Sequence, residues 1–375
     1  MIRRIYAQDM DKYLKAQKVF VLYGPRQVGK TTLVRSYLAS CNYKYRFDTG
    51  EDLEVRNLFS SQSLKEIKEY AQGYDLIVID EAQYIENIGL GLKLLVDHVP
   101  QIRVIATGSA SFELASKVGE PLTGRKVSRV LYPISQMELL GELNKYDLKA
   151  RLAEYLIYGS YPEVITEATL TEKREILREL VNSYLLRDIL QLERVKSPKI
   201  LVDILKLLAF QIGKDVSLSE IASGVKVDYK TVARYLDILQ KTFVIFAIPG
   251  FSRNMRKEVQ KNKRYYFVDN GIRNALITNF NSLENRGDVG ALWENFIVVE
   301  KLKINEYQRQ FLNFYYWRTY AQEEIDLVSE GDGKLSAFEI KYSASKAKFP
   351  NTFKNAYPTS SLHVINKNNY LDFLS

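Results

Sequence analysis

The stretch Val19-Phe20-Val21-Leu22-Tyr23-Gly24-Pro25-Arg26-Gln27-Val28-Gly29-Lys30-Thr31-Thr32-Leu33 joins an apolar run to a glycine-bounded loop that ends in Lys-Thr. The apolar run predicts a strand, and the amphipathic pattern from Thr32 onward predicts a helix. The spacing G-x-x-x-x-G-K-T between them is typical of a P-loop, in which backbone N–H groups at a helix N-terminus bind phosphate. The residues expected to contact a bound nucleotide here are Gly24, Pro25, Arg26, Gln27, Val28, Gly29, Lys30, Thr31 and Thr32.

A second motif, Leu76-Ile77-Val78-Ile79-Asp80-Glu81, predicts a buried strand with two carboxylates at its C-terminal end, where α/β sheets bind ligands. With the P-loop upstream, it predicts a site for ATP and Mg²⁺. Lys30 would reach the terminal phosphates, and the hydroxyl of Thr31 would bind the metal with Asp80. Glu81 would activate the attacking water. The alternative interpretation is a solvated strand end without a ligand.

Three later residues are further candidates for this site. Thr107 and Ser109 follow the apolar residues Val104-Ile105-Ala106, so they could position the attacking water or contact the γ-phosphate. They could equally be ordinary turn caps. Arg125 lies in the loop Leu122-Thr123-Gly124-Arg125, where it could act as a catalytic arginine finger or form a surface salt bridge.

Strand and helix patterns alternate in the first part of the chain, which predicts a parallel sheet with crossover helices. After this part, leucines and isoleucines recur at helical spacing and predict an all-helical segment. Patterns typical of strands reappear only in the later part of the chain. The strands expected in the first part are 19–23, 45–48, 76–80, 103–107 and 127–131. The domains expected are 1–145 for the sheet domain, 146–210 for a helical lid, 211–284 for a helix-turn-helix domain and 285–375 for a small α/β domain.

Composition limits the classes of protein to consider. At 375 residues the chain is too long for one ordinary core, and 46% hydrophobic with 26% charged residues is typical of a soluble globular protein. One cysteine and two histidines exclude an internal disulfide and a His/Cys zinc site. No run is long enough to span a membrane, and no signal peptide is recognised, so a cytoplasmic protein is expected. The formal charge of +8 favours polyanion partners only modestly.

The motifs resemble those of the prokaryotic AAA-type ATPases that carry a C-terminal domain of unknown function. The resemblance rests on residues 23–33, 79–83, 106–111, 122–125, 131–135 and 158–163, and it covers most of the chain. It implies an ATPase module, a helical lid, a winged helix and a nuclease-like end. It implies no cellular role, because the roles of that family are largely unassigned.

Two short helical patterns separated by a Gly-containing turn, near residues 217–239, predict a helix-turn-helix. Tyr229, Lys230 and Arg234 would lie on the side of the second helix that can face a DNA groove. A basic segment follows, and its side chains could contact DNA phosphates as a charged wing. These are Arg253, Arg256 and Lys257. The alternative is a protein-interaction module whose charges are simply solvated.

Four residues near the C-terminus match the order of acids and lysine in restriction-endonuclease-like nucleases. Asp326 falls on one strand, Glu339 and Lys341 alternate on the next, and Glu294 lies on the preceding helix. The three acids, Glu294, Asp326 and Glu339, could bind Mg²⁺, and Lys341 could orient or deprotonate the attacking water. A cross-strand Glu–Lys pair without a function would give the same short pattern.

The sequence therefore predicts an α/β protein with a P-loop AAA-type ATPase domain, a helical lid, a winged helix-turn-helix and a small restriction-endonuclease-like domain. The expected function is ATP hydrolysis coupled to DNA binding, with Mg²⁺-dependent cleavage of DNA. The chief alternative is an ATPase switch in a signalling or toxin-antitoxin-like defence system, whose C-terminal half binds protein or DNA without cleaving it. A third is an oligomeric remodeller, in which Arg125 would act across a homo-oligomer interface.

Overall fold

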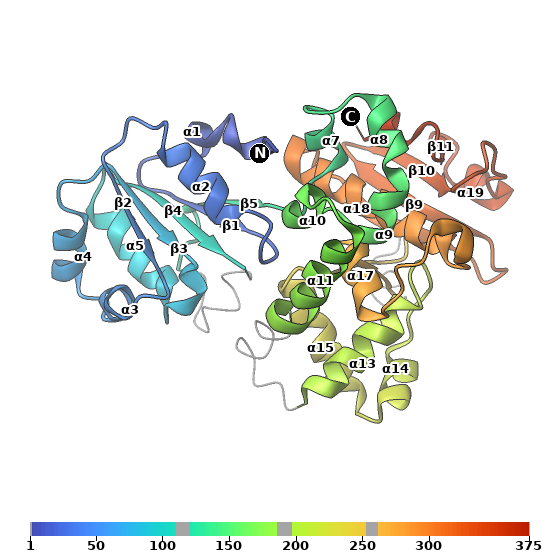
Figure 1. Ribbon diagram of the computed structural model, residues 1–375, viewed down its shortest axis with the longest axis horizontal. Helices are drawn as coiled ribbons and strands as arrows, with labels where there is room; N and C mark the ends of the chain where they lie inside the picture. The colour runs from blue at the N-terminus through green and yellow to red at the C-terminus, as the bar shows by residue number, and fades with distance from the viewer. Residues whose placement is uncertain (1, 110–120, 186–196, 253–261, 375) are drawn as a thin grey trace.

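The computed structural model describes residues 2–109, 121–185, 197–252 and 262–374. Figure 1 shows two parts side by side. The first part runs from the N-terminus to β5 (Lys126–Val130), and the second contains the elements that follow.

The first part is built on a five-stranded parallel sheet in the order β2-β3-β4-β1-β5. Its other strands are β1 (Val19–Tyr23), β2 (Tyr45–Thr49), β3 (Leu76–Asp80) and β4 (Arg103–Gly108). β1 and β3 are buried along their whole length, as expected of parallel strands that helices cover on both faces. The predicted α/β fold class with a parallel-sheet core is therefore confirmed, and each expected strand lies within one residue of its position.

Helices cover both faces of this sheet. α2 (Lys30–Leu38) packs on one face through Leu33 and Val34. The other face is covered by α3 (Leu53–Ser60), α4 (Leu64–Ala71) and α5 (Ile88–His98). Because the strands are parallel, the C-terminal ends of β1, β3 and β4 meet at one edge, and the chain brings the P-loop, Asp80 and Thr107 to that edge.

The second part begins with a group of helices. In chain order they are α7 (Gln136–Leu139), α8 (Lys145–Ala150), α9 (Leu152–Tyr158), α10 (Pro162–Thr166), α11 (Leu170–Glu179), a π-helix (Leu180–Leu185) and α13 (Pro198–Ala209). α9, α11 and α13 all pack against the later helix α17 (Asn270–Leu276). The amide of Asn274 on α17 donates to the carbonyls of Leu156 and Ile157. Residues 146–210 and 211–284 therefore share one core.

Residues 211–284 contain two helices joined by a turn and followed by two strands. These are α14 (Leu218–Val225), α15 (Tyr229–Lys241), β6 (Ile245–Ile248) and β7 (Arg264–Phe267), the strands pairing antiparallel. Asp228 caps α15 by accepting a hydrogen bond from the N–H of Thr231. The arrangement is a helix, a turn, a helix and a two-stranded sheet.

The C-terminal residues form a four-stranded sheet beside α18 (Val289–Gln308). Its strands, in the order β11-β10-β9-β8, are β8 (Asn313–Arg318), β9 (Glu324–Gly331), β10 (Lys334–Ile340) and β11 (Ser361–Ile365), with α19 (Asn351–Ala356) before β11. β11 was not predicted. Lys341, expected on the strand with Glu339, follows the last residue of β10 directly.

The two parts share a hydrophobic core. One cluster of buried side chains extends from Phe20 and Leu33 beside the first sheet to Trp293 and Ile297 on α18. Within the described residues, no helix is long and apolar enough to cross a membrane.

Candidate functional site

The P-loop, residues 24–29, connects β1 to the start of α2. Gly24 has φ of +145°, and a Cβ there would lie 2.0 Å from the carbonyl oxygen of Leu131, so only glycine fits. The ammonium group of Lys30 is buried and donates to the carbonyls of Gly24 at 3.0 Å and Pro25 at 2.8 Å. The lysine is thus folded over its own loop, within reach of the space where phosphates would bind.

A chain of hydrogen bonds joins the P-loop helix to the ends of β3 and β4. The hydroxyl of Thr31 donates to Asp80 Oδ2 at 2.8 Å, and the hydroxyl of Thr107 donates to Asp80 Oδ1. Thr107 also accepts a hydrogen bond from the backbone N–H of Glu81 at 3.1 Å. A hydroxyl and a carboxylate side by side are the oxygen ligands that Mg²⁺ prefers, so these residues fit the metal.

Glu81 is held by Gln83, a residue that was not predicted to belong to the site. The side-chain amide of Gln83 donates to Glu81 Oε2 and, at 3.2 Å, to the hydroxyl of Ser109. Glu81 itself adopts the left-handed conformation, with φ of +49°, which is uncommon for a residue other than glycine. The contacts bring Ser109 and Glu81 together. The feature of the sequence that could have indicated Gln83 is its position two residues after Glu81.

Arg125 lies far from the P-loop of its own chain. It precedes β5, whose first residue pairs with Val19 at the start of β1. It is therefore at the opposite end of β1 from the P-loop, roughly 16 Å away for a strand of five residues. Its guanidinium forms an ion pair with Asp97 at 2.5 Å. This position does not favour contact with a nucleotide bound by the same chain, and a role across a subunit interface stays a prediction.

A cavity of about 750 Å³ opens beside the start of α2. Its walls come from four segments. They are the N-terminal residues with Arg4, the P-loop and α2, the stretch from Ile134 to Glu142, and α10. The volume lies in the range of pockets for small molecules. The cavity could hold the base and ribose of a nucleotide whose phosphates lie in the P-loop.

A second polar cluster joins β9 to the end of β10. Lys341 Nζ lies 2.9 Å from Asp326 Oδ2 and 3.0 Å from Glu339 Oε2, and it thus bridges two buried carboxylates. The backbone N–H of Ile340 also donates to Asp326. We call Asp326, Glu339 and Lys341 the carboxylate cluster. Its acids have the oxygen donors that Mg²⁺ prefers.

Glu294 approaches this cluster from α18 and has partners of its own. It accepts a hydrogen bond from the hydroxyl of Tyr266 at 2.7 Å, and it faces Gly213, where a Cβ would lie 2.5 Å from Glu294 Oε2. Burial, followed by the nearby charge of Asp326, raises the pKa of Glu294 to about 7, and the same two causes raise the pKa of Glu339 to about 7. In the described part of the chain, no three acidic, His or Cys side chains converge as a metal site.

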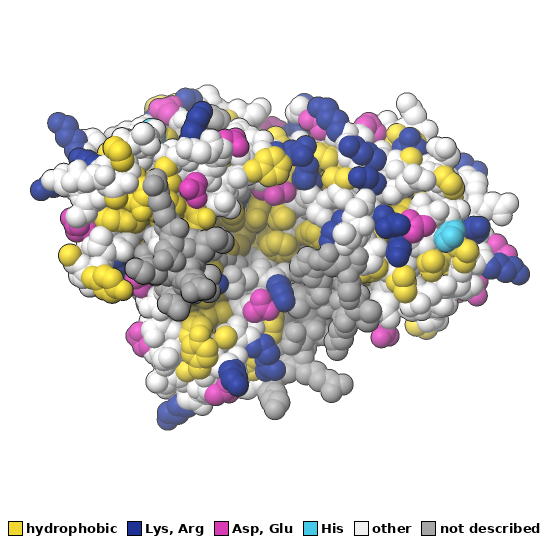
Figure 2. Space-filling view, turned by 180° about the vertical axis from the view of Figure 1, so that it is seen from behind, with side chains coloured by type: hydrophobic (Ala, Val, Ile, Leu, Met, Phe, Trp, Pro, Cys, Tyr) yellow, Lys and Arg dark blue, Asp and Glu magenta, His cyan; other side chains and the backbone are white. Residues whose placement is uncertain are grey.

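The predicted DNA-contacting residues of α15 are exposed on one side of the helix. Tyr229, Lys230 and Arg234 face solvent, whereas Val232 and Leu236 are buried. Figure 2 shows lysines and arginines spread over one face of the molecule among acidic side chains, without a single basic patch. The other predicted contacts, Arg253, Arg256 and Lys257, lie outside the described residues.

Comparison with known proteins divides the chain into three matched segments. Residues 16–140 match the AAA domain. Residues 149–283 and 289–373 match two different domains of unknown function. The first match, together with the geometry around Lys30 and Asp80, supports an AAA-type ATPase domain.

Two relatives match most of this chain. An uncharacterised protein of Mycobacterium tuberculosis is 29% identical over 344 residues, which cover 90% of this chain and 74% of the relative. An uncharacterised protein of Haemophilus influenzae is 29% identical over 372 residues, with 92% and 84% covered. The AMPPCP-bound DnaA from Aquifex aeolicus is similar over 63% of this chain and 84% of its own, at 15% identity and a TM-score of 0.29. A likeness this weak carries no argument about function.

Proposed function

We propose that this protein binds ATP with Mg²⁺ and hydrolyses it at the edge of the first sheet. The observation that carries the proposal is the chain of hydrogen bonds from Thr31 through Asp80 to Thr107, beside the buried Lys30. This chain connects a P-loop helix to a carboxylate strand and to the neighbouring strand. That is the arrangement that phosphoryl transfer to water requires.

Each residue around the phosphates has its own role in hydrolysis. Lys30 leaves the carbonyls of its own loop and pairs with the terminal phosphate oxygens. Glu81, oriented by Gln83, accepts the proton of the attacking water. Thr107 bonds to both Asp80 and the backbone N–H of Glu81 and so fixes their relative positions. Mg²⁺, held by Thr31 and Asp80, would neutralise the phosphate charge.

The test is phosphate release from ATP by the full chain, with Mg²⁺ and with excess EDTA. Hydrolysis that EDTA removes and Mg²⁺ restores is expected, because the oxygens of Thr31 and Asp80 lie 2.8 Å apart and suit that metal. Absence of hydrolysis together with absence of ATP binding would overturn the proposal.

Thr107→Val is expected to lower kcat for ATP roughly tenfold, since valine keeps the shape but removes the two hydrogen bonds of the hydroxyl. Steady-state kinetics and ATP binding would measure the effect, and binding is expected to stay near the wild-type level. Thr352→Val, the same change at an exposed position of α19, is the matched control. Equal kcat for Thr107→Val and the control would remove Thr107 from the site.

We further propose that the second part handles DNA and that the carboxylate cluster cleaves it with Mg²⁺. The observation in favour is the position of Lys341 between Asp326 and Glu339, where an ammonium group can orient a water against a metal-bound phosphate. Exposed Tyr229, Lys230 and Arg234 on α15 support a winged helix that faces DNA. The domain boundaries expected at 145, 210 and 284 stay predictions, and the boundary at 210 would divide residues that share one core.

The alternative is an ATPase switch whose second part binds a partner without cutting DNA. Stimulation of ATP hydrolysis by DNA, and a DNA affinity that falls steeply with salt, would favour the DNA-handling function. A protein that neither binds DNA nor responds to it would favour the switch.

Arg125 gives a separate prediction about assembly. Because Arg125 lies at the opposite end of β1 from the P-loop, Arg125→Ala is expected to reduce hydrolysis only if the protein forms a homo-oligomer. Mass measurement with and without ATP, beside the hydrolysis rates of the variant and the wild type, checks this. Unchanged hydrolysis in an assembled variant would remove Arg125 from catalysis.

A further inference from the structure

A buried arginine near the N-terminus contacts the backbone of the P-loop. Arg4 is 8% exposed, and its guanidinium donates to the carbonyl of Val28, the residue just before Gly29 and Lys30. The same group donates to Glu138 at 2.9 Å and to the carbonyl of Tyr132 at 2.6 Å. One side chain therefore joins the P-loop to two segments that follow the first sheet.

The two supports of Arg4 are themselves fixed. Glu138 accepts from the backbone N–H groups of Ile5 and Ser135 and completes the capping box of α7 with Ser135. The backbone N–H of Tyr132 donates to the hydroxyl of Tyr307 at 3.0 Å, while its carbonyl accepts from Arg4. Tyr307, on α18, therefore fixes the backbone of Tyr132 through its N–H, and its hydroxyl also accepts from the guanidinium of Arg4 at 3.5 Å.

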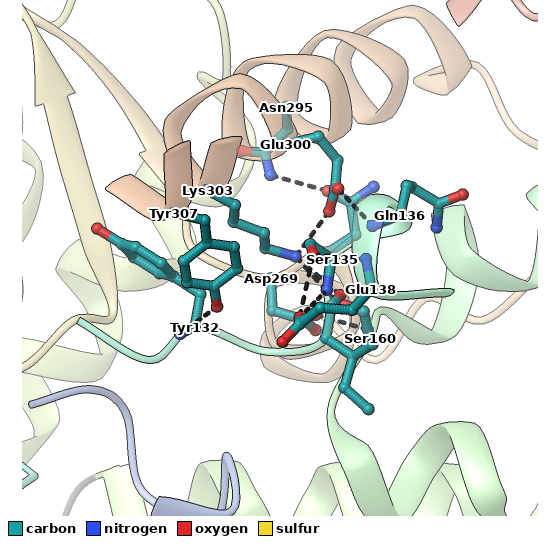
Figure 3. A network of polar contacts seen from close by, with 12 residues as sticks. Tyr132, Ser135, Gln136, Glu138, Ser160, Asp269, Asn295, Glu300, Lys303 and Tyr307 are labelled. Carbon is teal, nitrogen blue, oxygen red and sulfur yellow. Dashed lines mark hydrogen bonds and ion pairs between the residues drawn. The ribbon is translucent and has the colours of Figure 1, made fainter. Parts of the chain in front are cut away.

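The segment that leaves β5 lies along α18, and alternate residues of the segment bond to the helix. The N–H groups of Val130, Tyr132 and Gln136 donate to Glu306, Tyr307 and Glu300, and Lys303 donates to the carbonyl of Ile134. Figure 3 shows Tyr307, Lys303 and Glu300 pointing from the helix toward this segment. The helix that carries Glu294 near its start thus packs, near its end, against the segment that leads out of the first part.

We infer that Arg4 is a positioning residue for the P-loop and that Tyr307 of α18 holds it in place, so that the C-terminal part completes the nucleotide site. The inference rests on the proposed ATP binding. Burying a guanidinium is costly unless each of its donors has a partner. Here one donor is directed at a P-loop carbonyl, which fixes the orientation of the peptide group that leads into Gly29.

This role predicts a particular kinetic signature. The P-loop backbone binds the phosphates in both the ground state and the transition state, so disturbing its shape raises KM and leaves kcat nearly unchanged. A purely structural defect acts differently, because it lowers the fraction of folded protein. That lowers the apparent kcat and leaves KM as it was.

The experiment compares four full-length proteins: the wild type, Arg4→Lys, Tyr307→Phe and the control Tyr316→Phe. Lysine keeps the charge of Arg4 but cannot bond to Val28, Tyr132 and Glu138 at once. Tyr307→Phe removes only one hydroxyl, so it still tests the inference if Arg4→Lys does not fold. Tyr316 is also buried, and its hydroxyl donates at 2.7 Å to the carbonyl of Asn262, which is not among the partners of Arg4. Binding of ATP with Mg²⁺, KM, kcat and thermal stability are measured for each.

For Arg4→Lys we expect KM and the Kd for ATP to rise about tenfold, the equivalent of one charge-assisted hydrogen bond, with kcat within about twofold. Tyr307→Phe is expected to raise both roughly threefold, and Tyr316→Phe neither. Wild-type KM in folded Arg4→Lys and Tyr307→Phe would overturn the inference and leave the proposed ATPase standing. A wild type that does not bind ATP would overturn the proposed function itself.

Discussion

Glu81→Gln is expected to lower kcat for ATP hydrolysis by about two to three orders of magnitude, because the amide cannot accept the proton of the attacking water. Glutamine has the same shape, and the backbone N–H of residue 81 can still bond to Thr107. ATP binding should therefore stay within a few-fold of the wild type. Single-turnover hydrolysis and equilibrium binding with Mg²⁺ would measure the two effects separately.

A matched control for this variant is Glu86→Gln, the same change at an exposed position five residues later. It should hydrolyse ATP as the wild type does. If Glu81→Gln kept more than about a tenth of the wild-type kcat, another group would have to be the general base, and the role of Gln83 as the residue that orients Glu81 would be lost with it.

Asp326→Asn is expected to abolish DNA cleavage, with a loss of about a thousandfold or more, if the carboxylate cluster is a nuclease site. Asparagine can still accept from the N–H of Ile340, but it loses the charge that pairs with Lys341 and would bind the metal. The assay offers single-stranded, duplex and branched DNA with Mg²⁺ or Mn²⁺, with and without ATP. The readout is the rate of strand cleavage.

Two further variants complete that assay. Asp332→Asn changes an exposed aspartate in the turn between β9 and β10 and should cleave normally. Lys30→Ala disables the nucleotide site and reports whether ATP drives cleavage. If the wild type cleaves nothing under any condition, the second part is a binding module, and the result favours the ATPase switch over the DNA-cleaving function. If Asp326→Asn cleaves as well as the wild type, cleavage does not come from this cluster.

The parallel sheet and the nucleotide motifs could be predicted because their signals are local. The apolar runs before Gly24 and Asp80 are continuous, since both faces of those strands are buried. β11 was missed because it is short and only half-buried, and it reads as a loop between polar residues. The sharing of one core by residues 146–284 was also hidden, because the contacts of α17 come from helices far away in sequence.

The supporting residues of the site could not be predicted for a related reason. Arg4 is 24 residues from Val28 and 128 from Tyr132, so no periodicity links them. The contact between Tyr266 and Glu294 joins a hairpin to a helix in the same way. By contrast, the approach of Lys341 to Asp326 and Glu339 follows from the pairing of adjacent strands, which sequence order indicates.

The docking of residues 130–136 along α18 bears on how the protein can be divided for biochemical work. A fragment cut at the limits of the AAA match, residues 16–140, would lack both Arg4 and Tyr307 while keeping every residue of the P-loop motif. Such a fragment would also expose the apolar surface that now packs against α18. Truncated versions of this chain would therefore understate its nucleotide affinity and aggregate more readily than the intact protein.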